Sequence, residues 1–321
     1  MTHSSVHPPA SITQLGLVAG ECVIPGTHGK VLAAFSQALY LLTETGDLFW
    51  ITNAGFPMHR RAAVTALLPR PAAGSTFQVG NHQLTIEPCF ELDFQSARIW
   101  QEPAIEPIHI LETSGLPHRI HSFLRGLDLT EVKGFGIFIP TILSYSRKDS
   151  MDLLLSPTDP IIRQAQPLVL GLMRICAGGQ SSKNALYANG LIGLGAGLTP
   201  SGDDFLGGLL FAINSLRDAY PDVSLANLEI SIDSFRTRTN LISFTLLKDL
   251  SEGHGLAPLH EIVHGLLCGV DQARMQPSVQ QLTRVGHSTG WDVLTGLLTG
   301  LLVSYRLAHP LPLPKRVKVA K

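Results

Sequence analysis

The chain has 321 residues, of which 45% are hydrophobic and only 15% are charged, and its formal net charge is −1 at pH 7. This length allows a sizeable core and favours about two domains. A nearly neutral chain lacks the basic field that nucleic-acid binding requires, so we expect no nucleic-acid partner. We find neither a secretory leader nor an apolar run long enough to span a bilayer, so we expect no membrane association and a cytoplasmic protein.

The surface is expected to be partly covered by another chain. A mean hydropathy of +0.20 and 30 glycines accompany the low charge content, which favours either a homo-oligomer or a complex with partner subunits. The four cysteines lie far apart and outside any CxxC or Cys/His spacing. They are Cys22, Cys89, Cys176 and Cys268. We predict buried thiols rather than metal ligands or disulfides.

Residues 18–100 carry short β-prone runs separated by turn residues, which is typical of an antiparallel domain, either barrel-like or a sandwich. The expected strands are residues 30–43, 47–52, 76–79, 83–86 and 91–100. Gly46 lies in the turn of a first expected hairpin, and Gly80-Asn81-His82 forms the turn of a second. The loop at 53–59 could contact a ligand or be a plain connection, and turn residues alone favour the connection.

The proline-containing segment 101–107 marks the predicted domain boundary, because the hydrophobic period changes after it. Helices are expected over residues 107–126, 161–176 and 181–189. The run from Phe135 is ambiguous between helix and strand. We therefore predict an α+β protein with a β-rich domain at 1–104, a mainly helical domain at 105–310 and a basic tail at 311–321.

The most informative stretch is residues 191–216, LIGLGAGLTPSGDDFLGGLLFAINSL. Its alternating Gly193, Gly195 and Gly197 allow positive φ or a close approach of the backbone to a ligand. Ser201 precedes Asp204 by three residues, a capping-box-like spacing, so a helix should begin near Gly202. The residues that follow leave hardly any polar face, which indicates a helix buried on most sides.

A glycine loop at a helix N-terminus offers backbone N–H groups and a partial positive charge to phosphate or carboxylate. The spacing fits neither a Walker A motif nor a dinucleotide fingerprint. Asp203 and Asp204 would then meet N–H donors or a divalent ion such as Mg²⁺. The alternative is that these acids only balance the helix dipole, which explains two adjacent acids less well than one.

Residues 235–243, FRTRTNLIS, form a second polar segment. At helical spacing Arg236 and Asn240 share a face that could hold a carboxylate or phosphate. Equally, this face could be solvated, with ion pairs to Asp233 or Asp249.

Residues 285–292, VGHSTGWD, lead into another apolar, glycine-containing helix and repeat the design of the first motif. We predict that the two helix starts face each other across one pocket, where His287 and Asp292 act as proton carrier or orienting group. His254, His260 and His264 lack an HExxH frame, so we expect no metal there.

Three segments together carry a family resemblance: residues 193–208, 236–243 and 286–296. They are similar to the AllH-like family, in which one member is assigned as a subunit of oxamate carbamoyltransferase in anaerobic allantoin use. The resemblance covers most of the chain and is looser across the β-rich region. Arg238 departs from the family pattern, because a hydroxyl residue is expected there.

The resemblance implies carbamoyl transfer between carbamoyl phosphate and oxamate, or the reverse phosphorolysis of oxalurate, together with partner subunits. The catalytic residues would be His287, Asp203 and Asp204. Substrate would be bound by Gly195, Gly197, Leu198, Thr199, Ser201, Gly202, Arg236, Asn240, Gly286, Ser288, Thr289 and Asp292. Placement and charge stabilisation would suffice for this transfer, without a resident cofactor. The alternatives are a non-catalytic small-anion-binding or regulatory subunit and a Mg²⁺-dependent phosphotransfer enzyme.

Overall fold

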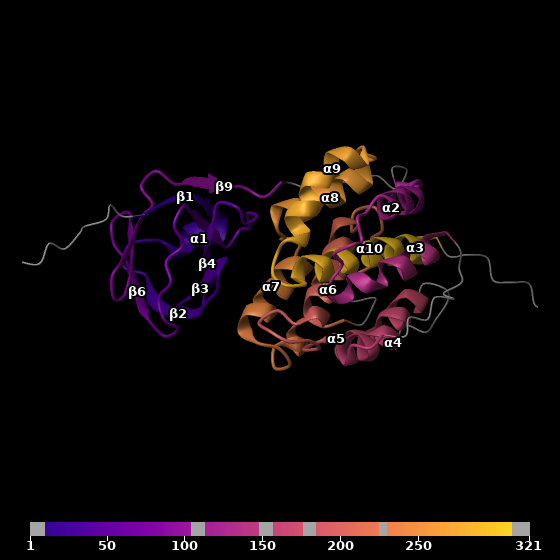
Figure 1. Cartoon of the computed structure of the whole chain (residues 1–321), viewed down its shortest axis with the longest axis horizontal. Helices are drawn as coiled ribbons and strands as arrows, with labels where there is room; N and C mark the ends of the chain where they lie inside the picture. The colour runs from indigo at the N-terminus through magenta and orange to yellow at the C-terminus, as the bar shows by residue number, and fades with distance from the viewer. Residues whose placement is uncertain (1–9, 104–112, 148–156, 176–183, 225–229, 310–321) are drawn as a thin grey trace, which may run out of the picture. The chain divides into compact units, whose positions relative to one another are not determined.

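The computed structural model describes residues 10–103, 113–147, 157–175, 184–224 and 230–309. The chain divides into two compact units, residues 1–104 with 254–260 and residues 105–253 with 261–321 (Figure 1). A short segment that follows the seventh helix therefore belongs with the N-terminal unit. The predicted basic tail, Cys176 and part of the first expected helix lie outside the described residues.

The first unit is a closed eight-stranded β-barrel with one extra strand. Its strands are β1 (Ala10–Gly16), β2 (His28–Ala34), β3 (Ala38–Thr43), β4 (Leu48–Asn53), β5 (Ala62–Thr65), β6 (Thr76–Val79), β7 (Gln83–Ile86), β8 (Phe90–Asp93) and β9 (Arg98–Trp100). The order is β5-β4-β3-β2-β6-β7-β8-β1, and β1 pairs with β5 to close the barrel, while β9 pairs with β1 outside it. Of the two predicted alternatives, the barrel is confirmed.

The barrel is mixed rather than purely antiparallel. The pairs β4–β5, β1–β8 and β1–β9 are parallel, and the other pairings are antiparallel. The two predicted hairpins are confirmed, with Gly46 at φ +90° in the first turn and His82 at φ +60° in the second. The parallel pairs could not be predicted, because they join strands that no short turn connects.

Two predicted single strands are each divided in the structure. Residues 30–43 form β2 and β3 around a turn in which the Phe35 N–H donates to the Ala38 carbonyl at 2.9 Å. Residues 91–100 contribute to β8 and β9, separated by a turn in which the Ala97 N–H donates to Phe94. Neither turn contains glycine or proline, so the usual sequence signal for a break is missing.

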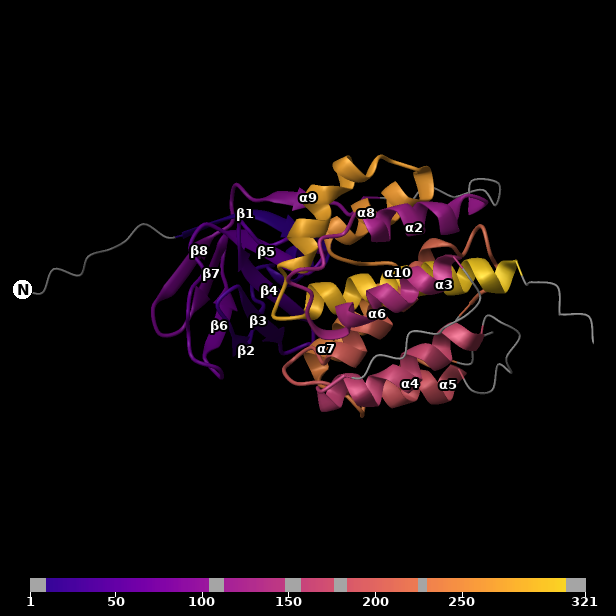
Figure 2. The same cartoon turned by 45° about the vertical axis from the view of Figure 1, so that its right-hand side comes forward.

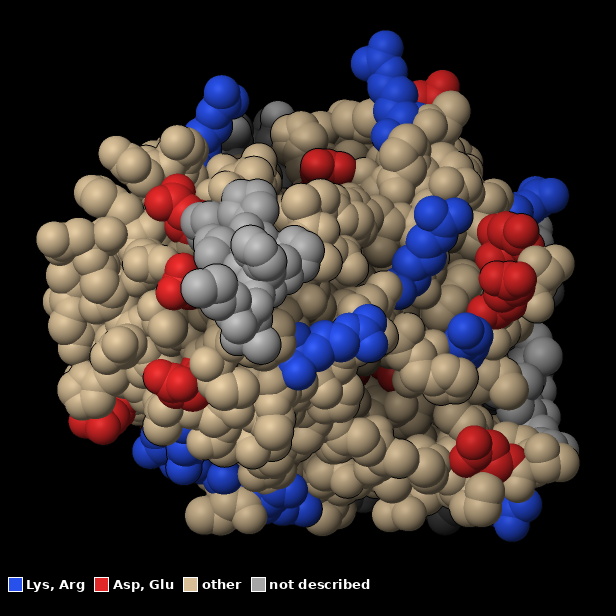
Figure 3. All heavy atoms as spheres, turned by 60° about the vertical axis from the view of Figure 1, so that its left-hand side comes forward, with Lys and Arg blue, Asp and Glu red and all other residues tan. Residues whose placement is uncertain are grey.

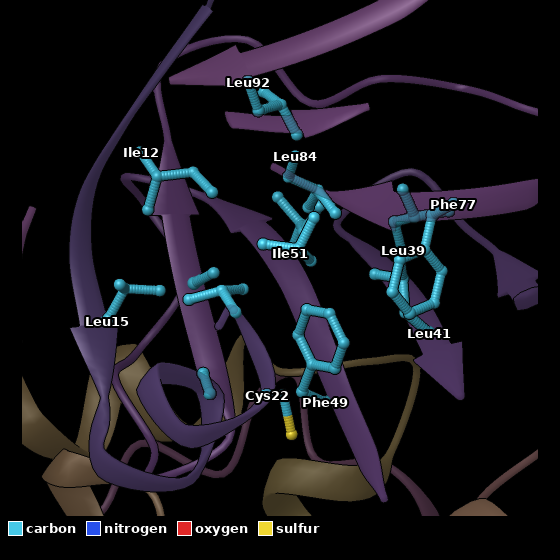
Figure 4. Packing of buried hydrophobic residues seen from close by; sticks show 14 of the residues in the cluster. Ile12, Leu15, Cys22, Leu39, Leu41, Phe49, Ile51, Phe77, Leu84 and Leu92 are labelled. Carbon is cyan, nitrogen blue, oxygen red and sulfur yellow. The ribbon is translucent and has the colours of Figure 1, made fainter. Parts of the chain in front are cut away.

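Apolar side chains fill the barrel interior (Figure 4), where residues such as Leu39, Phe49 and Ile51 are fully buried. The short helix α1 (Leu17–Cys22) adds Val18, Ala19 and Cys22 to this core, although the segment was predicted as β-rich. Burial first of all raises the pKa of the Cys22 thiol to about 12. The prediction of buried thiols is therefore correct for Cys22 and wrong for Cys89 and Cys268, which are exposed.

The second unit is helical. Its elements are α2 (Leu116–Arg125), the 3₁₀ helix η2 (Gly134–Phe138), α3 (Ile139–Arg147), α4 (Pro160–Ile175), α5 (Asn184–Leu191), α6 (Ser201–Ser215), η4 (Asp233–Phe235), α7 (Leu241–Ser251), α9 (Gln272–Thr283) and α10 (Thr289–Ala308). Helix α8 (Ala257–Cys268) begins within residues assigned to the first unit. The run from Phe135, ambiguous in sequence, is helical. The predicted α+β class, a β domain followed by a helical region, is confirmed.

Helices α6 and α10 run side by side in both views (Figures 1 and 2). A Cβ atom on Gly208 would lie 2.0 Å from the Val293 carbonyl, and one on Gly296 would lie 1.9 Å from the Phe205 carbonyl. Glycine is therefore required at these positions, because the two backbones are in direct contact. A Cβ atom on Gly300 would lie 2.6 Å from the Leu209 carbonyl, so the contacts advance from Gly296 with Phe205 to Gly300 with Leu209. The pair is therefore parallel, and both N-termini lie at one end.

The surface carries few charges. On the face shown in Figure 3, Lys, Arg, Asp and Glu side chains are dispersed among other residues. Among the described helices, none has the length and apolar character to cross a membrane.

Candidate functional site

The starts of α6 and α10 meet through four hydroxyl side chains. The Oγ1 atoms of Thr199 and Thr289 lie 3.0 Å apart, and the Oγ atoms of Ser201 and Ser288 lie 3.4 Å apart. We call these four half-buried residues the hydroxyl layer. The two motifs are 87 to 90 residues apart in sequence, and their predicted convergence is observed.

Two buried carboxyl groups, Asp204 and Asp292, lie next to the hydroxyl layer, and we call them the acid pair. Asp204 is 5% exposed and Asp292 is 0% exposed. The Oδ2 atom of each has no hydrogen-bond partner among the residues that the structure describes. Such orphaned oxygens are unusual in a protein interior and require an explanation.

Burial is the main reason why both acids hold a proton more tightly than usual. It raises the pKa of Asp204 well above its ordinary value, and the neighbouring Asp292 charge raises it further, while Thr289 and Thr199 oppose the shift by hydrogen bonding. Burial raises the pKa of Asp292 to about 6, against the opposing hydrogen bonds from Phe135, Ser288 and Ser201. The pair therefore favours a state with fewer than two negative charges.

The segment before η2 fixes Asp292 in place. The Phe135 N–H donates to Asp292 Oδ1 at 2.5 Å. Gly134 has φ +52°, and a Cβ atom there would lie 2.2 Å from the same carboxylate oxygen. The sequence analysis missed this contact, and the only available signal was a glycine immediately before an apolar run.

Asp203 and Asp204 are adjacent in sequence but contact different groups. Its Oδ1 accepts the Gly193 N–H at 2.6 Å, and its Oδ2 accepts the Ser243 hydroxyl at 2.6 Å and the Thr239 hydroxyl. Consecutive residues on a helix point about 100° apart, so the two carboxylates face different neighbours. Asp203 therefore connects the glycine loop to the start of α7.

The glycine loop has the predicted backbone but uses its donors internally. Gly193, Gly195 and Gly197 have φ of +75°, +132° and +92°. The N–H of Gly202 donates to the Leu194 carbonyl at 2.8 Å, and that of Gly193 to Asp203. An anion would therefore have to use groups other than these two N–H groups.

The predicted capping box is not formed. Pro200 is the N-cap of α6, and its carbonyl accepts the N–H groups of both Asp203 and Asp204. Ser201 instead lies inside the first turn, where its hydroxyl faces Ser288. This frees the Asp204 side chain to face Asp292 rather than the backbone of its own helix.

Arg236 and Asn240 do not share a helix face, because α7 begins only at Leu241. Asn240 is the N-cap of α7: its side-chain oxygen accepts the Ser243 N–H at 3.1 Å, while its Nδ2 donates to the Leu198 carbonyl at 2.7 Å. Arg236 is exposed, with its guanidinium carbon 5.4 Å from the centroid of the Phe244 ring. Asn240 thus fixes Leu198, and Arg236 packs on an aromatic ring.

The remaining predicted residues, Gly286 and His287, lie in the exposed turn before α10. Gly286 has φ +62°, and a Cβ there would lie 2.9 Å from Thr289 Oγ1. His287 directly precedes Ser288 of the hydroxyl layer, which places its imidazole on the solvent side of the same helix start.

Two of the other histidines, His254 and His260, lie beside a carboxylate. His254 Nδ1 lies 2.6 Å from Glu102 Oε2, and His260 Nε2 lies 3.8 Å from Glu102 Oε1. Burial alone would raise the pKa of Glu102, but hydrogen bonds from the two histidines outweigh it and lower the pKa to about 2. Across the described part of the chain, no three or more His, Cys, Asp and Glu side chains are grouped so that they could hold a metal ion.

The geometry defines a polar site at the paired starts of two parallel, buried helices, with an acid pair next to a layer of hydroxyl groups. Residues 191–301 match the family model described as oxamate carbamoyltransferase subunit AllH. The expected resemblance is therefore confirmed over a segment that contains the glycine loop, the hydroxyl layer and the acid pair. No solved structure matches the chain.

Proposed function

We propose that this protein is a component of an oxamate carbamoyltransferase and that the joined starts of α6 and α10 form its substrate site. The observation that supports this proposal is that one matched segment contains both polar motifs, which lie in contact at one end of the helix pair. Because the matched family is described as a subunit, the proposal includes partner subunits. The transfer would serve nitrogen release from purine-derived ureides.

The reaction joins the oxamate nitrogen to the carbamoyl carbon. A new C–N bond forms, the bond from the carbamoyl carbon to the phosphate oxygen breaks, and phosphate leaves with that electron pair, while the nitrogen loses a proton. The protein must therefore hold two small substrates close together and accept one proton. The half-buried hydroxyl layer can contact the substrates, and the buried acids next to it hold the hydroxyl groups in a fixed arrangement.

The groups at the two helix starts have different roles in this proposal. The hydroxyl layer would contact substrate, Asp292 would set the hydrogen bonding of the two serines, and His287 would accept the released proton, since an imidazole exchanges protons readily near neutral pH. Asp203 would act indirectly, by holding the glycine loop against α7. Asp204 would set the hydrogen bonding of the two threonines beside it.

The test is phosphate release from carbamoyl phosphate in the presence of oxamate, measured with the full-length chain alone and together with its partner subunits. We expect Ser288→Ala and His287→Ala to lower kcat by at least about tenfold, whereas Ser234→Ala, an exposed serine elsewhere in the chain, should leave it unchanged. Unchanged rates for both site variants in an active complex would contradict the assignment.

The same assay distinguishes the other functions expected from sequence. A small-anion-binding or regulatory subunit would alter the rate of its partners, yet its own site variants would change ligand affinity without changing kcat. A Mg²⁺-dependent phosphotransfer enzyme would lose activity in EDTA and regain it with Mg²⁺.

A further inference from the structure

We propose that the acid pair shares one proton and thereby orients the hydroxyl layer to accept hydrogen bonds from the –NH₂ group of an amide or carbamoyl substrate. This inference rests on the proposed function and specifies which part of the substrate binds at the helix starts. It assigns Asp204 and Asp292 as positioning residues and the four hydroxyl oxygens as the groups that contact substrate.

We infer the shared proton from which carboxyl oxygens of the acid pair have a hydrogen-bond partner and which do not. Asp292 Oδ1 accepts the Phe135 N–H, whereas Oδ2 of Asp292 and Oδ2 of Asp204 have no described partner and are buried. Carboxylate oxygens can only accept, so two charged groups would leave both Oδ2 atoms unsatisfied. One proton makes one oxygen a donor and the other its acceptor, and it also removes the repulsion between two charges in a dry site.

The charges of Asp292 and Asp203 both raise the pKa of Asp204. Asp203 itself accepts hydrogen bonds from Gly193, Thr239 and Ser243. His287, the titratable side chain that directly precedes the hydroxyl layer, lies in the exposed turn before α10. Proton binding by the acid pair therefore reduces the negative charge at the buried end of the helix pair.

The acids determine in which direction the hydroxyl groups of the layer donate their hydrogens. Hydrogen bonding with Thr289 and Thr199 lowers the pKa of Asp204, and hydrogen bonding with Ser288 and Ser201 lowers that of Asp292. The two threonine hydroxyls lie 3.0 Å apart and the two serine hydroxyls 3.4 Å apart. In the proposed arrangement one hydroxyl of each pair donates to the other, which in turn donates to the acid, so both hydrogens of the pair are used. A hydroxyl has one hydrogen, so a hydroxyl that donates inward to a carboxyl oxygen presents only lone pairs outward. The layer therefore presents acceptors to the half-exposed side of the site.

The hydrogen-bond acceptors of the hydroxyl layer favour the amide group of the proposed substrates over their phosphate and carboxylate groups. The amide of oxamate carries two N–H donors, which match two neighbouring hydroxyl oxygens. A phosphate or carboxylate would place its lone pairs against those of the hydroxyls, an unfavourable contact. The layer thus recognises the amide end of oxamate and leaves the anionic groups to bind elsewhere.

The test compares oxamate with pyruvate, which has the same charge and a methyl group in place of –NH₂. Binding to the full-length chain, alone and as a complex with its partners, is measured by calorimetry without carbamoyl phosphate. We expect oxamate to bind about tenfold tighter or more, the combined effect of two hydrogen bonds between neutral groups. Equal affinities, or no binding of oxamate in either form, would overturn the proposal.

Variants test the orientation directly. Asp292→Asn places an amide donor next to the layer and reverses nearby hydroxyls, and Thr199→Val removes one acceptor at similar size. Both should bring the oxamate-to-pyruvate ratio close to one, whereas Asp218→Asn, an exposed acid beyond the end of α6, should keep the wild-type ratio. If both site variants kept the wild-type oxamate-to-pyruvate ratio, the assignment of the hydroxyl layer as the amide site would be contradicted, even if the variants were less stable than the wild type.

The proton itself is visible in the infrared spectrum, where a protonated carboxyl has a C=O band distinct from that of a carboxylate. We expect this band in the wild type at neutral pH and its loss in Asp292→Asn and Asp204→Asn. Its absence in the wild type would exclude a shared proton. Because neither measurement involves carbamoyl transfer, an inactive complex would refute the proposed function and leave the amide preference as an independent result.

Discussion

The barrel interior and the start of the helix pair are both buried, yet their contents differ. The barrel core consists of apolar side chains such as Leu39, Phe49 and Ile51. The helix starts bury three acids, Asp203, Asp204 and Asp292, within a few residues of glycine turns. Apolar burial stabilises a fold at no electrostatic cost, whereas buried acids must be compensated by hydrogen bonds or protons. The costly arrangement is the one expected of a functional site.

The largest expected effect is on the backbone contact that holds the helix starts together. Gly296→Val would place a side chain within 1.9 Å of the Phe205 carbonyl, so we expect destabilisation of about 4 kcal/mol or more. Chemical denaturation followed by circular dichroism measures it. Phe49→Ala in the barrel should cost a similar amount, about 3 to 5 kcal/mol, by leaving a cavity instead. A Gly296→Val protein as stable as the wild type would show that the helices do not touch there.

The two regions should respond oppositely to pH. The raised pKa values of Asp292 and Asp204 stabilise the fold at low pH, and this contribution is lost as pH rises through the raised pKa of each group, which is about 6 for Asp292. For Asp292 the loss is about 2 kcal/mol between pH 4 and pH 7, out of about 3 kcal/mol for the whole titration. Glu102, whose pKa is lowered to about 2, stabilises the first unit above its unfolded pKa and loses this contribution as pH falls.

Tryptophan fluorescence separates these two trends, because Trp50 is a buried residue of β4 that stacks on His59 in the first unit, whereas Trp291 adjoins Asp292. In variants that keep only one of the three tryptophans, either Trp50 or Trp291, with Trp100 replaced in both, the Trp291 transition should show stability falling from pH 4 to pH 7. Asp292→Asn should flatten this dependence without altering the Trp50 transition. A Trp291 transition that becomes more stable with rising pH would contradict the raised pKa values.

A smaller effect is expected where Asp203 holds the glycine loop. Ser243→Ala removes one donor at 2.6 Å from the buried carboxylate, so we expect a loss of about 2 kcal/mol, as for a hydrogen bond to a charged group. Thermal or urea unfolding measures it, with the exposed Ser234→Ala as the matched control. Identical stabilities of the two variants would show that Asp203 is held without Ser243.

The smallest effect is expected in the glycine loop itself. Gly197 has φ +92° with open space around its Cβ position, so Gly197→Ala should cost about 1 kcal/mol from backbone strain alone. Gly195→Ala should cost more, since its Cβ would also lie 2.6 Å from the Ser201 nitrogen. The reverse order of the two unfolding free energies would show that steric contact does not limit the loop.

The sequence by itself determined the features that depend on near neighbours. Alternation and turn residues located the hairpins, glycine spacing gave the positive φ values at Gly193 to Gly197, and the apolar runs gave the two buried helices. The repeated plan of the two helix starts also suggested that they meet, because a motif used twice in one chain favours a common site.

Only the tertiary structure decided which groups meet across long stretches of chain. It closed the barrel through β1 and β5, returned residues 254–260 to the first unit, and brought Asp292 close enough to raise the pKa of Asp204 more than the adjacent Asp203 does. The physical reason is that local patterns fix backbone conformation, whereas the direction of a buried side chain depends on the helix that packs against it. Glycines that bring two backbones into contact set that packing here, and with it the chemistry of the site.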